Sequence, residues 1–218
     1  MNNKLFLLVM IFFIASTAFA QNVRLNGYAL GVFDDKVDSY YDNSNYYNGT
    51  IKGGFAWGAG IEFMAHHDYG IELSYLRQDT KAPITYYSNG VKNTNFDLGV
   101  NYVMIGGTRY FQKRGSKAEG FGGAMLGGNF LSLKNPDNGK NTSKTFFAWG
   151  IKGGVNIWAS DKVGIKLQAQ LLSAVQSVGG GFYFGTGGVG AGLSSYSSMY
   201  QFGLGGGLVF KMGGPAKK

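Results

Sequence analysis

The stretch Ile51–Met64, IKGGFAWGAGIEFM, has two unlike faces when it is read at every second residue. The odd-numbered face is apolar and aromatic, with Phe55, Trp57, Ile61 and Phe63. The even-numbered face carries only small or charged residues and Met64. Because successive side chains of a strand point to opposite faces, this pattern predicts a β-strand between an apolar and a polar environment.

The same period of two recurs along the chain, and no convincing helical period follows residue 20. Five further segments show it clearly: Tyr69–Gln78, Phe96–Phe111, Phe147–Ile157, Val163–Leu171 and Tyr200–Lys211. Two others, Val23–Phe33 and Ala118–Leu133, have mixed faces, so their register stays open. Together they predict an all-β chain of about eight strands.

The expected connections alternate in length. Three are short, namely Ala65–Asp68, Gln112–Lys117 and Ala159–Lys162. Four are long, at about Asp34–Thr50, Asp79–Asn95, Lys134–Lys144 and Gln176–Ser195. This alternation is typical of a transmembrane antiparallel up-and-down β-barrel, with short turns and both termini in the periplasm and long loops outside.

The first twenty residues have the order of a secretory signal peptide. Lys4 supplies a positive charge, Leu5–Ile14 is unbroken and apolar, and small residues stand at Ala18 and Ala20. We therefore expect a cleaved segment 1–20 and a single barrel domain at 21–218. The chain has no cysteine, which excludes a lipoprotein and a disulfide scaffold. Its net charge is +8 without a basic run, so nothing indicates nucleic-acid binding.

A soluble barrel with its apolar face inward would also alternate, but the residue types favour a membrane barrel. The polar faces are rich in glycine and alanine, which suit a narrow lumen better than a wet exterior. Aromatic residues collect near the strand ends, where they would form girdles at the two membrane interfaces. The predicted girdle residues are Trp57, Phe63, Tyr69, Tyr75, Tyr110, Trp149 and Phe210.

Charged residues on the polar faces form the candidate site. The residues predicted to point into the lumen are Lys52, Glu62, Glu72, Asp97, Arg109, Lys152 and Lys166. In Phe96–Phe111 this assigns the apolar even-numbered face to lipid and the odd-numbered face to the lumen. Such charges must be paired or hydrated. Two interpretations stay open: a packed salt-bridge network that fills the barrel, and a narrow hydrated path.

Other motifs predict no chemistry. Gly185–Gly190, GTGGVG, matches a dinucleotide-binding pattern but lacks the strand and helix that such a site needs. His66 and His67 are the only histidines, and adjacent strand residues point opposite ways, so we expect no joint metal site. They also lie in a periplasmic turn, away from the outer leaflet where a Ser-His lipid enzyme would act. We expect no catalytic residue and no cofactor.

The signal peptide, the glycine-rich alternating strands and the closing strand QFGLGGGLVFKM at 201–212 together resemble the small outer-membrane β-barrels of the OmpX and opacity-type superfamily, in the style of Bacteroidota. The resemblance covers the mature chain. It departs from the family at the end, where Lys211–Lys218 follow the last aromatic residue, Phe210.

This resemblance implies location in the cell outer membrane of a Gram-negative-type bacterium. It also implies contact with outer-membrane lipids, and with the barrel assembly machinery during biogenesis. We expect a non-enzymatic structural or surface-interaction role, with an unknown extracellular protein or glycan partner for the loops. The alternatives are a narrow channel for small or hydrophobic solutes and, more remotely, an outer-membrane lipid-modifying enzyme.

Overall fold

The computed structural model describes residues 23–40, 46–87, 91–136, 139–175, 181–185, 188–192 and 199–212. The predicted signal peptide, 1–20, lies outside these residues. Within the described ranges, no helix is long and apolar enough to cross a membrane.

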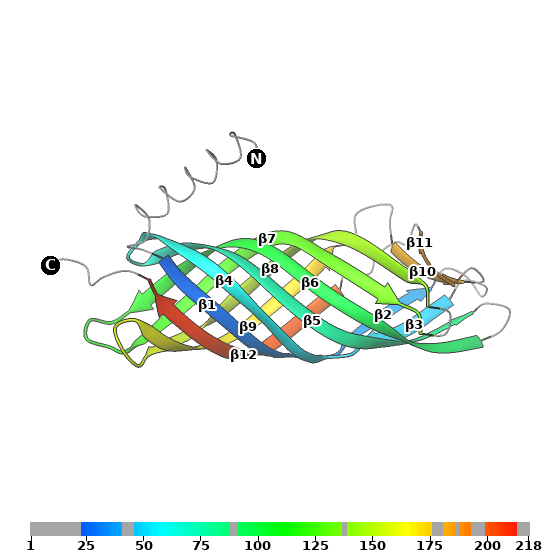
Figure 1. Ribbon diagram of the computed structural model, residues 1–218, viewed down its shortest axis with the longest axis horizontal. Coiled ribbons are helices and arrows are strands. Elements are labelled where there is room, and N and C mark those ends of the chain that lie inside the picture. Colours follow the sequence, from blue (N-terminus) through cyan, green and yellow to red (C-terminus); the bar gives the residue numbers. More distant parts are fainter. Residues whose placement is uncertain are drawn as a thin grey trace, which may run out of the picture.

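Eight strands form a closed antiparallel barrel, as the alternating pattern predicts (Figure 1). Each strand pairs with the barrel strands before and after it in the chain, and β1 pairs with β12 to close the ring. The barrel strands are β1 (Val23–Val32), β4 (Gly54–His66), β5 (Tyr69–Tyr87), β6 (Val91–Gln112), β7 (Ala118–Lys134), β8 (Asn141–Trp158), β9 (Val163–Val175) and β12 (Met199–Lys211).

The long connections contain more strand than the sequence predicted. The first holds the hairpin β2 (Asp35–Tyr40) and β3 (Tyr46–Ile51), and β3 pairs with the far end of β5. The last holds a separate hairpin, β10 (Gly181–Gly185) and β11 (Gly188–Gly192). The loop predicted at Asp79–Asn95 is wrong, because β5 and β6 continue as paired strands up to Tyr87 and Val91.

The two ends of the barrel differ in length. The turns β4–β5, β6–β7 and β8–β9 lie at the end where β1 begins and β12 finishes, on the left of Figure 1. The hairpins and the extended parts of β5 and β6 lie at the other end. Short turns and both barrel termini mark the periplasmic end of an outer-membrane barrel, so the extended end is extracellular.

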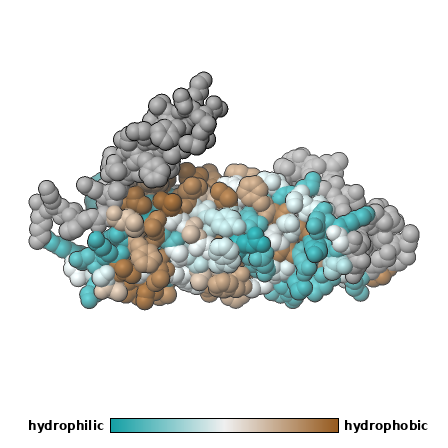
Figure 2. All heavy atoms as spheres, in the orientation of Figure 1, coloured by the Kyte–Doolittle hydropathy of each residue, from teal (hydrophilic) through white to brown (hydrophobic). Residues whose placement is uncertain are grey.

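An apolar belt surrounds the periplasmic half of the barrel. Figure 2 shows hydrophobic side chains gathered toward that half and hydrophilic ones over the extended end. On β4 the outward residues are Phe55, Trp57, Ile61 and Phe63, each about half exposed. A tilted strand crosses a bilayer in about nine to eleven residues, which is the length from Phe55 to Phe63. These exposed apolar side chains therefore face lipid.

The polarity of the wall reverses where β5 and β6 leave the membrane. Near the periplasmic end the outward residues of β6 are apolar, with Val103 and Ile105 exposed. Farther along, the apolar residues turn inward: Phe96, Leu98 and Val100 are buried inside the barrel. The sequence-based assignment of this even-numbered face to lipid is therefore wrong. Above the bilayer the exterior is wet, so the apolar side chains of this segment pack in the interior instead.

This reversal predicts unequal costs for the same substitution on the outward face of β6. Ile105→Arg should lower the free energy of unfolding by about 2–4 kcal/mol, since Ile105 faces the hydrocarbon. Asn95→Arg on the same face should change it by less than about 0.5 kcal/mol, since Asn95 is exposed above the bilayer. Denaturant unfolding of the barrel in lipid vesicles measures both, and equal costs would contradict the assigned membrane boundary.

Candidate functional site

A charged network fills the lumen of the membrane-spanning half. It contains three cations and three carboxylates, and their exposed fractions run from 0% to 7%. Because the charges balance, the network as a whole is neutral. Its charged members are Arg24, Glu62, Glu72, Glu119, Lys152 and Lys166.

Glu72 is the centre of this network. Its carboxylate forms an ion pair with Lys152 and accepts hydrogen bonds from the Tyr28 hydroxyl and, at 2.8 Å, from the Asn26 amide. Lys152 reaches it from β8, across the barrel from β5. A buried carboxylate is tolerated only when its charge is compensated and its oxygens are hydrogen-bonded, and both conditions hold here.

Glu62 lies directly opposite Glu72 in the β4–β5 register, so two carboxylates are cross-strand neighbours. The hydroxyl of Tyr110 lies 2.6 and 2.7 Å from the two oxygens of Glu62 and donates to that carboxylate. Asn26 also approaches Glu62, at 3.5 Å. Donors from β1 and β6 thus stabilise a pair of like charges that would otherwise repel.

The periplasmic end of the network is closed by a bidentate ion pair. Arg24 donates to both oxygens of Glu119, at 2.8 and 3.1 Å, and Asn156 donates to the same carboxylate at 2.9 Å. The guanidinium also lies over the rings of Tyr110 and Trp158, 4.3 and 5.5 Å from their centroids. The planar fork of arginine suits both contacts, which together span the lumen from β1 to β7.

Lys166 is fully buried and, among the described residues, its ammonium has no hydrogen-bond partner. It lies instead over the aromatic rings of Phe121 and Tyr28, with the nitrogen 4.8 and 5.5 Å from their centroids. The faces of aromatic rings attract cations, most strongly where water is excluded. These contacts and the nearby carboxylates compensate the Lys166 charge.

Four of the seven residues predicted for the lumen lie there: Glu62, Glu72, Lys152 and Lys166. Asp97 does not, because it faces outward above the membrane and pairs with Lys81 at 2.9 Å. Arg109 also faces outward, over the ring of Phe111. Both errors follow from assigning the odd-numbered face of β6 to the lumen, because that face points outward along the whole strand.

Lys52 is the third correction. The predicted strand 51–64 is interrupted, since β3 ends at Ile51 and β4 begins at Gly54. Gly54 has a φ of 148°, which other residues rarely adopt, and between β3 and β4 the register with β5 shifts by one residue. Lys52 is therefore exposed and forms a 2.8 Å ion pair with Asp34 outside the lumen.

The predicted aromatic girdle needs one correction. Trp57, Phe63, Tyr69, Tyr75, Trp149 and Phe210 lie on the outward face. Trp57 packs edge-on against Tyr75, with ring centroids 6.2 Å apart. Tyr110 is only 3% exposed and points into the lumen, where its hydroxyl donates a hydrogen bond to Glu62.

Sequence reasoning missed Arg24 and Glu119 because each lies on a segment of mixed faces. A signal was present in the first of these segments. Arg24, Asn26 and Tyr28 alternate with Leu25 and smaller residues, so one face is already polar. All three members of that polar face point inward in the structure.

Comparison with known proteins agrees on the fold. The crystal structure of Neisserial surface protein A matches with a TM-score of 0.54 and 15% identity, over 87% of this chain and 96% of that one. OprG from Pseudomonas aeruginosa matches at 0.56 and 10%, over 87% and 95%. The outer membrane protease OmpT from Escherichia coli matches at 0.51 and 9%, over 87% and 96%.

No family model matches the chain, and no curated protein sequence does. The fold likeness and the lipid-facing belt lead to one conclusion. The chain is an integral β-barrel protein of the outer membrane.

The inward position of Tyr110 predicts a difference between two tyrosines of the periplasmic half. Tyr110→Phe removes the donor of a buried carboxylate and should lower the free energy of unfolding by about 1–3 kcal/mol. Tyr69→Phe, the matched control at an exposed girdle position, should cost less than about 0.5 kcal/mol. Unfolding in lipid vesicles measures both. A larger cost at Tyr69 would contradict the assigned lumen contact.

Proposed function

We propose that the protein is a non-enzymatic surface protein whose barrel is closed and whose extracellular sheet contacts a partner outside the cell. The observation that carries this proposal is the filled interior. The six charged groups of the lumen are at most 7% exposed. Water therefore has almost no access to the level at which a channel would need it.

A second, apolar level closes the interior above the charged network. Phe96, Leu98, Val100, Leu131 and Leu133 belong to one buried hydrophobic cluster. Phe96 and Val100 have no exposed surface. A packed apolar level excludes water, so it interrupts a hydrated path through the lumen. The two levels together favour a stabilising interior over the alternative of a solute channel.

The extracellular end offers the surface for a partner. The β2–β3 hairpin extends the sheet beyond β5 and stiffens the first long connection. Backbone pairing brings Tyr47 opposite Tyr86, and Tyr40 opposite Tyr46. For these four tyrosines the structure describes the backbone pairing alone. Tyrosine is common in recognition surfaces because its rigid ring offers both apolar and hydrogen-bonding contact, which suits a protein or a glycan partner.

The positions of the histidines support a non-enzymatic role. A lipid-modifying or proteolytic histidine would need to reach the outer leaflet or the extracellular space. Both histidines of this chain lie in the β4–β5 turn, at the periplasmic end. The likeness to OmpT is a likeness of fold at 9% identity and carries no activity to this chain.

Planar-bilayer recording tests the closed interior. The refolded barrel should give no channel events. A variant that carries Glu72→Ala, Lys152→Ala, Phe96→Ala and Leu131→Ala removes side chains from both levels without changing the net charge, and it should conduct. Heat-dependent gel migration confirms that both proteins are folded. Stable unitary currents from the unmodified barrel would overturn the closed interior.

Trimming the hairpin tests the surface role. A variant with residues 36–50 replaced by a short glycine-serine turn keeps all eight barrel strands, and it should lose binding to partners found for the unmodified barrel. Lipid-nanodisc preparations of both proteins can be applied to arrays of glycans and of extracellular proteins. Replacing the periplasmic turn 113–116 in the same way gives the control. Equal array profiles for all three proteins would contradict a role for the hairpin.

A further inference from the structure

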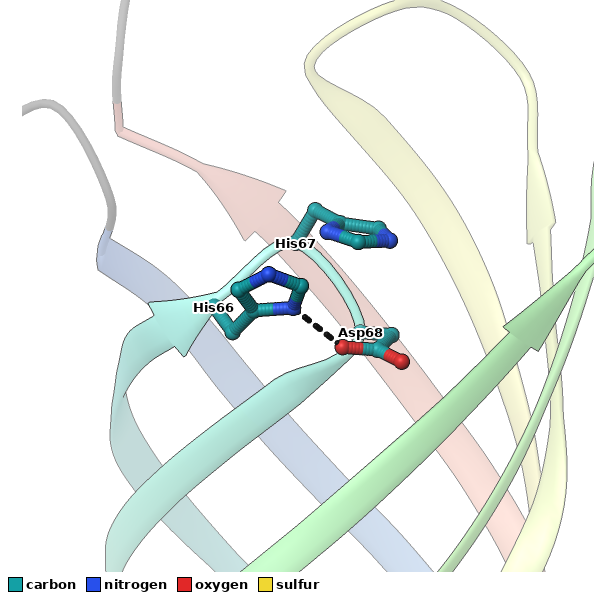
Figure 3. Close-up of side chains that lie close together, drawn as sticks. All are labelled: His66, His67 and Asp68. Carbon is teal, nitrogen blue, oxygen red and sulfur yellow. Dashed lines mark hydrogen bonds and ion pairs between the residues drawn. The ribbon is translucent and has the colours of Figure 1, made fainter.

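The β4–β5 turn brings three metal-binding side chains together at the periplasmic end. β4 ends at His66 and β5 begins at Tyr69, with His67 and Asp68 between them. In the described part of the chain, these three residues form a group whose donor atoms all lie within 4.8 Å of one another. Figure 3 shows the two imidazole rings beside each other and Asp68 next to His66.

The turn geometry corrects the expectation that adjacent histidines point apart. The β4–β5 register shifts between Met64 and His66, which indicates a bulge at this position. A bulge changes the direction in which a side chain points. The result is that the rings of His66 and His67 lie with their centroids 4.0 Å apart. Both histidines can therefore bind the same metal ion.

The donor set selects the type of ion. Two imidazoles and one carboxylate suit Zn²⁺ and Cu²⁺, whereas Mg²⁺ and Ca²⁺ prefer oxygen ligands alone. With metal–ligand bonds of about 2.0–2.1 Å, tetrahedral donors lie about 3.3 Å apart. His66 Nδ1 and Asp68 Oδ1 are already 2.5 Å apart. Metal binding therefore requires the hydrogen bond between His66 and Asp68 to open and the donors that lie up to 4.8 Å apart to move closer.

The backbone of the turn is fixed, but its side chains are accessible. The carbonyl of Asp68 accepts a 2.8 Å hydrogen bond from the backbone N–H of Tyr110 on β6. This bond ties the turn to the neighbouring strand. The His66 side chain is 64% exposed and that of Asp68 is 35% exposed, so an ion from the periplasm meets no barrier.

We propose that His66, His67 and Asp68 bind one divalent transition-metal ion, Zn²⁺ or Cu²⁺, at the periplasmic face of the barrel. Water completes the coordination, because the turn is open on its outer side. The site lies outside the lumen, so it does not depend on whether the barrel conducts.

Metal titration of the folded mature barrel in lipid nanodiscs, prepared without a polyhistidine tag, tests the proposal. We expect one Zn²⁺ per barrel, measured by competition with a chromogenic chelator, with no displacement by millimolar Mg²⁺ or Ca²⁺. His66→Asn and His67→Asn should each weaken binding at least about tenfold, and Asp68→Asn should weaken it less. Asp161→Asn, in the β8–β9 turn at the same end, is the matched control and should leave the affinity unchanged.

Cu²⁺ electron paramagnetic resonance adds a readout that a change in folding does not imitate. The bound ion should show coupling to the nitrogens of two imidazoles, and each histidine variant should lose one of them. Heat-dependent gel migration identifies any variant that fails to fold, and His66→Gln and His67→Gln then replace it. The proposal is overturned if the unmodified barrel binds no Zn²⁺ at about 100 micromolar. It is also overturned if the double histidine variant binds Zn²⁺ as tightly as the unmodified barrel does.

Discussion

The lipid bilayer imposes the constraint on which the rest of this structure depends. Backbone groups inside it have no water to bond, so the sheet must close, and it does through the pairing of β1 with β12. The lipid also requires an apolar exterior. Because side chains alternate along a strand, every second residue points into the lumen, which is narrow in a barrel of eight strands. Polar side chains there cannot be well hydrated. They are accommodated by compensation, and three cations meet three carboxylates in the charged network.

The same strands obey the opposite rule once they leave the membrane. Outside the bilayer the wall of the barrel faces water, and a packed apolar interior becomes the stable arrangement. β5 and β6 pass through both environments, so β6 has Ile105 on its outer face and Phe96 on its inner face. One strand pair thus carries a membrane barrel and a water-exposed extension. The interior is consequently filled by ion pairs within the membrane and by apolar side chains above it.

This change of environment explains what the sequence could and could not predict. A period of two identifies strands, and it placed Glu62, Glu72, Lys152 and Lys166 inside because lipid faces the other side. It does not state which face is inward. The rule that apolar residues face outward therefore failed on β6, where Asp97 lies above the membrane and Arg109 at the periplasmic end. Aromatic character alone suggested a girdle role for Tyr110, whose hydroxyl is needed by a carboxylate on another strand. Glu119 was missed because the glycines of Ala118–Leu133 give neither face a clear polarity, whereas the polar face of Arg24, Asn26 and Tyr28 was present but not used.

A single residue connects the lumen with the periplasmic turn. The hydroxyl of Tyr110 donates to Glu62 in the network, and its backbone N–H donates to the carbonyl of Asp68. The turn that carries His66 and His67 is therefore held by a strand whose own position is fixed by the packed lumen. The closed interior proposed above leaves activity to the two ends of the barrel, and the rigidity of the turn bears on the proposed metal site there. It allows a short exposed turn to keep three donors together, which a mobile loop of the same sequence would achieve only at a cost in conformational entropy.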